Sequence, residues 1–314
     1  MVTLGTDKKM LQKITLVVIA ALTLISLVLL LIIIAMSIGD KPSVNDDEDL
    51  DIKLEFVDGN ATDAQLSSGS LILANKNTPY TAPSDLSVVN IAEFRDRATG
   101  RDIDPSLPYP YVSANKYNFY MAADAIESMH DMLMDMKDAT KCTGISVSAA
   151  YGKSDYPADK DIHTGYTIVL MVDLEEDTTR VNPYFTDESN EDLNKWMTEN
   201  AHKYGFVTRY PADKAEITGV SDYTYAYRYV GAAHATLMME EGPCLEEYLE
   251  YLKKNSSSKD PITVKGADNA NYVVYYAECA DSEATIKLPA ESEKYTYTVS
   301  GTNCGGVVIT VKVK

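Results

Sequence analysis

The longest apolar stretch of the chain lies close to its N-terminus. Residues 14–39 contain no charged side chain, whereas Lys8, Lys9 and Lys13 precede them and an acidic run follows. As a helix rising about 1.5 Å per residue, this stretch would span roughly 39 Å, more than the ~30 Å hydrocarbon core of a bilayer. The positive-inside bias therefore predicts a cytoplasmic tail at 1–13 and an uncleaved transmembrane signal anchor at 14–39. A cleaved signal peptide is the alternative, but no clear cleavage site follows the apolar stretch.

Residues 40–69 have a different character. Acidic residues far outnumber basic ones here, and apolar residues follow no regular period. Like charges repel one another and extend such a segment. We therefore expect an acidic linker that holds the rest of the chain, outside the cell, away from the membrane.

Between the acidic segment and residue 256, stretches with the hydrophobic periodicity of helices and of strands follow one another. Apolar residues three or four apart indicate helices over 117–140, 190–204 and 232–254. Within the first, Ile126, Met129, Leu133 and Met136 form the expected core face. Runs of β-branched and apolar residues indicate strands over 70–75, 145–151, 166–174 and 225–230. This order does not alternate regularly, so it predicts an α+β domain over 70–256.

The chain changes character again after the polar residues 255–260. Short alternating runs occupy 262–264, 272–276, 284–288, 295–299 and 307–313, with turn residues between them. This pattern predicts a small antiparallel β module over 261–314.

Composition narrows the possible functions. The formal net charge of −19 argues against nucleic acid as a partner, because nucleic acid requires a concentrated basic surface. Four cysteines, Cys142, Cys244, Cys279 and Cys304, show no spacing typical of a structural zinc site. In an exported chain Cys279 and Cys304 could pair, although buried free thiols fit the sequence as well.

One long segment resembles a known family. Residues 196–231, WMTENAHKYGFVTRYPADKAEITGVSDYTYAYRYVG, are similar to the membrane-anchored zinc D-alanyl-D-alanine carboxypeptidases of the VanY type. The similarity extends from SLILANKNTPY at 70–80 to YTVSGTNCGGVVITV at 297–311. It implies a carboxypeptidase-like core with a small antiparallel sheet and flanking helices. It also implies zinc as cofactor, held by His, Asp and His, a glutamate base, and peptidoglycan stem peptides as substrate.

This chain departs from the family at its chemical positions. The family's Ser-x-His-x-x-Gly-x-x-x-Asp motif, aligned on Gly165, places Ile162 at the metal histidine and Val169 at the metal aspartate. The Glu-Pro-Trp-His motif, which precedes an aromatic-Arg-Tyr-Val-Gly run, places Tyr223 at the base and Ala226 at the second metal histidine. A catalytic zinc needs about three protein ligands and a base for its water. The resemblance therefore implies a degenerate member without catalytic residues, metal ligands or bound zinc.

One further substitution concerns the substrate cleft. The family's substrate-binding arginine aligns with Gly152. The candidate ligand cleft instead holds Tyr151, His163, Tyr166, Tyr223, Tyr225 and Arg228. Tyrosine rings offer a large contact area at low entropic cost, so these residues could bind a peptide or glycan. A cleft closed by the same rings is the alternative.

The leading hypothesis is an extracytoplasmic, single-pass cell-wall protein that binds without catalysis. Its expected partners are a peptidoglycan stem peptide or another cell-envelope protein, together with the membrane through one N-terminal helix. A zinc D,D-carboxypeptidase with a relocated site is one alternative, which would require His163 with Asp173 and a third ligand such as Asp222 or His234. A purely structural partner of another membrane protein is the other.

Overall fold

The computed structural model describes residues 53–113, 118–152, 161–223 and 225–314. The expected signal anchor at 14–39 lies outside these residues. Among the helices in these ranges, none is long and apolar enough to cross a bilayer.

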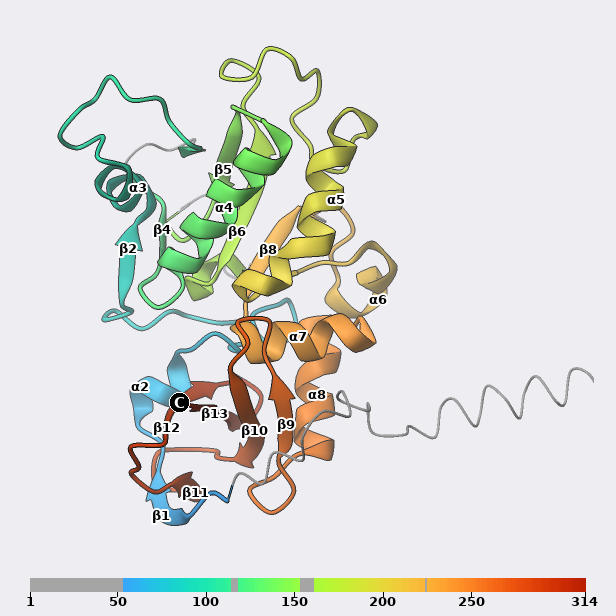
Figure 1. The fold of residues 1–314 in the computed structure, drawn as a ribbon. Coiled ribbons are helices and arrows are strands. Elements are labelled where there is room, and N and C mark those ends of the chain that lie inside the picture. Colours follow the sequence, from blue (N-terminus) through green and yellow to red (C-terminus); the bar gives the residue numbers. More distant parts are fainter. Residues whose placement is uncertain (1–52, 114–117, 153–160, 224) are drawn as a thin grey trace, which may run out of the picture. The chain divides into compact units, whose positions relative to one another are not determined.

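A five-stranded sheet forms the centre of the first half (Figure 1). Its strands, in spatial order, are β3 (Val112–Ser113), β5 (Ile145–Ala149), β6 (Thr167–Val172), β8 (Ala226–Tyr229) and β7 (Phe206–Thr208). Only the β3–β5 pair is parallel. Mixed helices and small sheets confirm the α+β expectation.

Two helices share a core with this sheet. They are α4 (Ile126–Thr140) and α5 (Glu191–Asn200), the latter continued by the short helix η3 (Ala201–Tyr204). The predicted apolar face of α4 is confirmed, because its four members are buried beside apolar residues of β5 and β6. The cluster excludes water from one face of the sheet, which holds β6 and β8 in place for the candidate site.

Helix α4 starts later than the periodicity predicted. Residues 120–122 form β4 (Tyr120–Ala122), which pairs with β2 (Val88–Asn90), and α3 (Ile91–Thr99) follows β2 directly. Residues 71–75 are buried but do not form a strand, because the Arg228 guanidinium donates hydrogen bonds to the carbonyls of Ser70 and Ile72. A side chain therefore satisfies groups that a neighbouring strand would otherwise bond.

The predicted helix over 232–254 is two helices. Helix α7 (Ala232–Glu241) ends at Gly242, whose φ of 62° is the left-handed cap conformation. Pro243 follows, and α8 (Leu245–Asn255) begins after Cys244. Short helical turns elsewhere are η1 (Asp161–Thr164), η2 (Glu188–Asn190), η4 (Ala212–Lys214) and α6 (Ala215–Thr218).

The C-terminal strands form the predicted antiparallel module. Its four-stranded sheet has the order β12 (Tyr295–Gly301), β13 (Gly306–Val313), β10 (Asn271–Glu278) and β9 (Ile262–Lys265). Strand β11 (Thr285–Pro289) pairs instead with β1 (Phe56–Asn60). All four cysteines are free thiols, so Cys279 and Cys304 are not paired.

The acidic segment differs from the spacer that its charge suggested. Residues 56–67, placed in the 40–69 linker, form β1 and the helix α2 (Asp63–Ser67). Ala61 is buried in the core of the β module, and Phe56 and Leu66 pack against it. Scattered apolar residues suffice for this docking because the module supplies the rest of the core.

Candidate functional site

The positions that the resemblance assigns to zinc chemistry meet in one small apolar cluster. Ile162, Val169 and Ala226 are buried together there, and Tyr223 packs against the same cluster. Val169 on β6 and Ala226 on β8 are direct cross-strand partners. Ile162 joins them from η1, which immediately precedes β6. We use the name apolar cluster for the buried residues Ile162, Val169 and Ala226 together with Ala149 and Tyr210, against which Tyr223 packs.

Zinc does not fit these residues. Hydrocarbon side chains offer no lone pair to a metal, and the buried apolar surroundings would disfavour a bare cation. Within the described ranges, no group of three or more His, Cys, Asp or Glu side chains is placed to hold a metal ion. We therefore derive no chemical step through zinc.

Both ring nitrogens of His234, a possible ligand of a relocated zinc site, already have hydrogen-bond partners. Its Nδ1 lies 2.7 Å from the hydroxyl of Tyr248, and its Nε2 lies 2.8 Å from the hydroxyl of Thr310. Burial lowers the pKa of His234 to about 3, so the ring is neutral near pH 7. The side chain ties α7 to α8 and to β13 of the C-terminal sheet.

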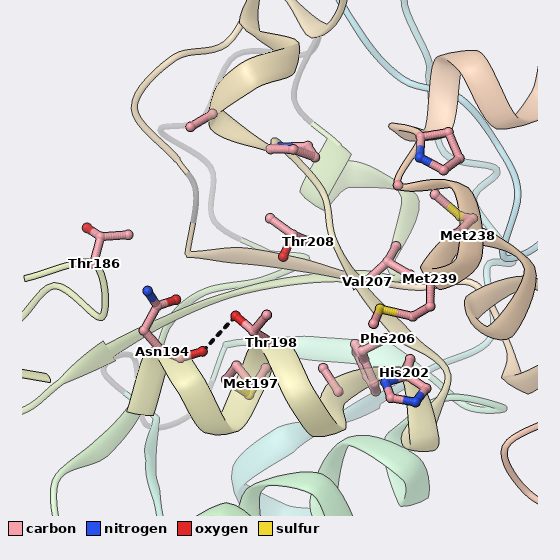
Figure 2. A pocket seen from close by; sticks show the side chains of 15 residues that line it. Thr186, Asn194, Met197, Thr198, His202, Phe206, Val207, Thr208, Met238 and Met239 are labelled. Carbon is pink, nitrogen blue, oxygen red and sulfur yellow. Dashed lines mark hydrogen bonds between the residues drawn. The ribbon is translucent and has the colours of Figure 1, made fainter. Parts of the chain in front are cut away.

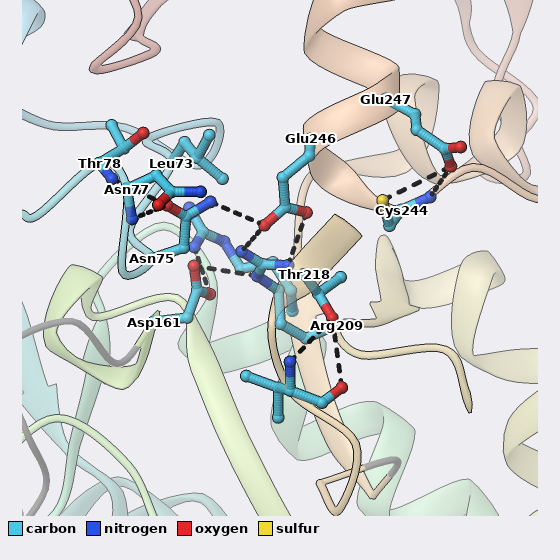
Figure 3. Close-up of polar contacts among 12 residues, drawn as sticks. Leu73, Asn75, Asn77, Thr78, Asp161, Arg209, Thr218, Cys244, Glu246 and Glu247 are labelled. Atoms are coloured by element: carbon cyan, nitrogen blue, oxygen red, sulfur yellow. Dashed lines mark hydrogen bonds and ion pairs between the residues drawn. The ribbon is translucent and has the colours of Figure 1, made fainter. Parts of the chain in front are cut away.

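A buried charge network lies beside the apolar cluster. Asp161 is fully buried, and its carboxylate contacts Arg209 at 3.0 Å and Arg228 at 2.5 Å. The hydroxyl of Thr167 donates to the same carboxylate. Arg209 in turn forms two hydrogen bonds with Glu246 on α8, at 2.9 and 3.0 Å, as Figure 3 shows. We call these four charged residues the buried network.

The network is balanced in charge, with two carboxylates and two guanidinium groups. Burial alone would raise the pKa of Asp161, but Arg209 and Arg228 outweigh it and lower the pKa below 3.8. The Asp161 carboxylate is therefore charged at neutral pH. Asp161 directly precedes Ile162, so the network fixes the loop that carries the first substituted metal position.

Arg228 is not placed to meet a ligand. Its side chain is fully buried, and its guanidinium donates to Asp161 and to the carbonyls of Ser70 and Ile72. Tyr166, also assigned to the cleft, is buried with Arg228 5.6 Å from its ring centre, and its hydroxyl donates to Asp124 at 3.2 Å. Both residues therefore support the scaffold.

The remaining cleft residues lie nearer the surface. Tyr223 and Tyr225 are half-buried with ring centres 5.9 Å apart, and Tyr184 adds a third ring 5.4 Å from Tyr225. Tyr151 forms a bridge with Tyr120 of β4, and His163 is half-buried in η1. The structure thus brings Tyr223 and Tyr225 together and adds Tyr184, which is 44% exposed. We name these three residues the tyrosine row.

Gly152, at the family's arginine position, has a local reason to be glycine. Its φ is 99°, and a Cβ atom there would collide with the carbonyl oxygen of Asn118. Any side chain would strain this backbone. An arginine could therefore not replace Gly152 unless the backbone here also changed its conformation.

Sequence reasoning missed several residues of this region. Asp161, Arg209 and Glu246 occupy none of the ligand, base or substrate positions that the family motifs define, and Tyr184 lies far from Tyr225 in sequence. One signal was present: Arg209 stands in an apolar strand run, FVTRYP, where a charge requires a buried partner. The identity of that partner depends on tertiary contacts.

Comparison with known proteins places this chain among D-alanyl-D-alanine carboxypeptidases. The VanY D-alanyl-D-alanine carboxypeptidase family model matches residues 134–232. A D-alanyl-D-alanine carboxypeptidase of Enterococcus faecium is 29% identical over 258 residues, covering 80% of this chain and 77% of the relative. The putative carboxypeptidase YodJ of Bacillus subtilis (strain 168) is 32% identical over 196 residues, covering 58% of this chain and 68% of that protein.

A solved structure shares the fold. The crystal structure of the vancomycin resistance D,D-dipeptidase VanXYg, in complex with a D-Ala-D-Ala phosphinate analog, aligns with a TM-score of 0.60 at 23% identity. The alignment covers 83% of this chain and 99% of that one. Sequence motifs, matched relatives and fold agree, and the chain belongs to the VanY D-alanyl-D-alanine carboxypeptidase family.

Proposed function

We propose that this chain is a non-catalytic member of its family that binds peptidoglycan stem peptides outside the cell membrane. One observation supports the proposal: the residues at the positions that the family motifs assign to the zinc ligands lie together in the apolar cluster, with Val169 and Ala226 as direct strand partners. A family member that performed metal-assisted hydrolysis would need ligands and a base at these positions. The names of the relatives support the choice of ligand, because they are D-alanyl-D-alanine carboxypeptidases.

The tyrosine row supports retained binding. It adjoins the apolar cluster through Tyr223 and Tyr225 and reaches the surface at Tyr184. Tyrosine combines an apolar ring with a hydroxyl that can exchange hydrogen bonds with amide groups. Such a surface suits D-alanine methyl groups and peptide bonds together, and it contributes contact area without requiring a metal.

The catalytic half of the proposal is tested with the purified full-length chain. We expect no stoichiometric zinc by elemental analysis, and no release of D-alanine from an Ala-Glu-Lys-D-Ala-D-Ala pentapeptide in the presence of added zinc. A variant combining Ile162→His, Val169→Asp, Tyr223→Glu and Ala226→His serves as a comparison and should gain zinc affinity. Chelator-sensitive release of D-alanine by the natural chain would refute the proposal.

The binding half is tested by calorimetry with the same pentapeptide. We expect Tyr184→Ala to weaken binding by about tenfold, the loss of one well-placed aromatic contact. Tyr297→Ala is the matched control, because Tyr297 is 37% exposed on the C-terminal sheet. Equal affinities for the natural chain and both variants would remove the tyrosine row from the binding site.

The proposed location rests on the sequence pattern of residues 14–39. Alkaline phosphatase fused after Lys314 should be active in intact cells if the C-terminal part is exported. Activity only after cell lysis would contradict an extracytoplasmic role.

A further inference from the structure

The four-stranded sheet of the C-terminal module ends in an exposed strand. Strand β12 pairs only with β13 among the described strands. Residues 296–298, at its middle, are all exposed, and Tyr297 is 37% exposed. At its far end the N–H of Gly301 donates to the carbonyl of Ser68, the residue after α2, at 3.0 Å. We call residues 296–299 the open edge.

The register with β13 decides which main-chain groups of β12 face outward. Just before β12, the carbonyl of Lys294 accepts a hydrogen bond from the N–H of Lys314 at 2.8 Å, and the pairing then continues without a shift. Every second residue of an antiparallel strand bonds to the same neighbour, so the N–H and C=O groups of Tyr297 and Val299 point away from β13. Among the described residues these groups have no hydrogen-bond partner.

The open edge lacks the features that usually keep sheet edges apart. Natural edge strands commonly carry charged residues, proline or a bulge, which prevent pairing with another chain. Strand β12, YTYTVSG, contains no charged residue and no proline, and its ladder with β13 has no bulge. Strand β9, at the other end of the same sheet, is only four residues long, follows Pro261 and ends at Lys265. The sheet is therefore protected at one end and not at the other.

Strand β7, which ends the five-stranded sheet, is covered instead. Phe206 of this strand is fully buried, and η3 and α7 both contact β7. Figure 2 shows Phe206 together with His202 and Met239 in the lining of a pocket of about 430 Å³. Helices close off the end of that sheet, whereas the middle of β12 remains exposed.

We propose that a second copy of this chain occupies the open edge, with the two β12 strands antiparallel about a twofold axis at Tyr297. The N–H and C=O groups of Tyr297 then exchange two hydrogen bonds with the same groups of the other copy. The two Tyr297 rings become cross-strand neighbours, and Thr296 lies opposite Thr298 of the other copy. Aromatic pairs and threonine pairs in these positions stabilise antiparallel sheets.

Charge and symmetry favour a second copy as the occupant. With a formal net charge of −19, two copies repel each other across most of their surfaces, but not where the uncharged β12 strands meet. A twofold contact needs a patch that is complementary to itself, and one strand edge used twice meets this condition. The assembly closes at two copies, because the protected β9 ends each sheet. This interface does not depend on the proposed function.

Cross-linking of the purified full-length chain tests the register. Across a hydrogen-bonded antiparallel pair the Cα atoms lie about 5.5 Å apart, within the range of a disulfide. Mild oxidation with copper phenanthroline should therefore convert Tyr297→Cys into a covalent dimer. Thr263→Cys is the matched control, because Thr263 is exposed on β9. This variant and the natural chain, whose four cysteines are all free thiols, should remain monomeric on a non-reducing gel.

Sedimentation velocity tests the main-chain hydrogen bonds. Pairing one strand edge buries a small interface, so we expect a dimer with a Kd on the order of 10 µM. Tyr297→Pro removes an outward N–H and leaves the ladder with β13 intact, so it should raise the Kd at least about tenfold. Thr263→Pro removes an outward N–H from β9 and should leave the Kd unchanged. Circular dichroism shows whether each variant is folded.

Four results would overturn the inference. They are a natural chain that is monomeric at about 100 µM, no covalent dimer from Tyr297→Cys, an unchanged Kd in a folded Tyr297→Pro variant, and an equal rise in Kd for Thr263→Pro. If Tyr297→Pro does not fold, the cross-linking result decides.

Discussion

Asp161 joins more of the candidate site than any family motif residue considered above. Its single carboxylate contacts two guanidinium groups and a hydroxyl, and its backbone leads directly into Ile162. Because Asp161 and both arginine side chains are fully buried, their charges interact with one another and not with water. The residue thus fixes the short helix that carries Ile162.

Replacing Asp161 should be costly. Asp161→Asn leaves two buried guanidinium groups with one carboxylate, and we expect a loss of about 3–5 kcal/mol in unfolding free energy. Asp58→Asn is the control, because Asp58 pairs with Lys287 at the surface and is 67% exposed. Urea unfolding followed by circular dichroism measures both. Similar midpoints for the two variants would contradict the role given to the buried network.

Acid should destabilise the protein through His234 before it affects Asp161. The pKa of His234 falls from 6.5 to about 3 on folding, so the unfolded chain binds a proton that the folded chain excludes. Stability should therefore fall as the pH drops below 6.5, by up to about 1.4 kcal/mol per pH unit from this one group. Asp161, whose folded pKa is lowered, contributes stability that is lost only below 3.8.

Urea unfolding measured at successive pH values tests this order. His234→Asn should lower stability at neutral pH, because the bonds to Tyr248 and Thr310 are lost. It should also flatten the pH dependence between about pH 6 and pH 4. An unchanged slope in the variant would assign the acid sensitivity to other groups.

At the scale of elements, periodicity predicted where the core lies better than where elements end. The buried face of α4 followed from apolar spacing, but its start did not, because Tyr120–Ala122 pairs with β2 instead. Strand pairing between distant residues leaves no local pattern. The stretch 70–75 was misassigned for a related reason, since its carbonyls bond the Arg228 side chain.

At the candidate site, too, the sequence predicted some features and not others. Family motifs predicted which residues replace the ligands, and the structure gathers Ile162, Val169 and Ala226 in one cluster. The motifs could not reveal that the buried Arg228 side chain forms an ion pair with Asp161, because that contact joins residues 67 positions apart in the sequence. Three-dimensional placement decides which aromatic and charged residues remain accessible.

The break between α7 and α8 was visible in sequence as Gly242 followed by Pro243. Gly242 has a φ of 62° and open space where a Cβ would lie. Gly242→Ala should therefore cost about 1 kcal/mol through backbone strain alone, and Gly242→Asn clearly less, because asparagine adopts this conformation more readily. Thermal unfolding of the two variants compares them. Equal losses would mean that the cap conformation is not what limits this position.

At the scale of the whole described unit, a strand near its beginning pairs with a strand of the C-terminal β module. Strand β1 pairs with β11 from Phe56↔Pro289 to Asn60↔Thr285. The ring of Phe56 meets Tyr275 edge to face at 5.7 Å. The C-terminal β module therefore includes a segment that precedes the carboxypeptidase-like domain in sequence.

This attachment predicts different effects for neighbouring residues. Phe56→Ala should lower the unfolding free energy by roughly 2 kcal/mol, because a partly buried ring leaves the module core. Val57→Ala should have little effect, since Val57 is 50% exposed. Chemical denaturation distinguishes the two. Similar losses at both positions would show that strand pairing, and not core packing, holds β1.

The β1–β11 pairing also sets the order in which the chain can be completed. Synthesis produces Phe56 early, but its partner Pro289 appears only after nearly all of the intervening sequence. Closing so long a loop is slow, and until then β1 exposes strand edges to other chains. Newly made molecules should depend on protection of this segment, and truncation before residue 285 should leave β1 without its native strand partner and prone to aggregation.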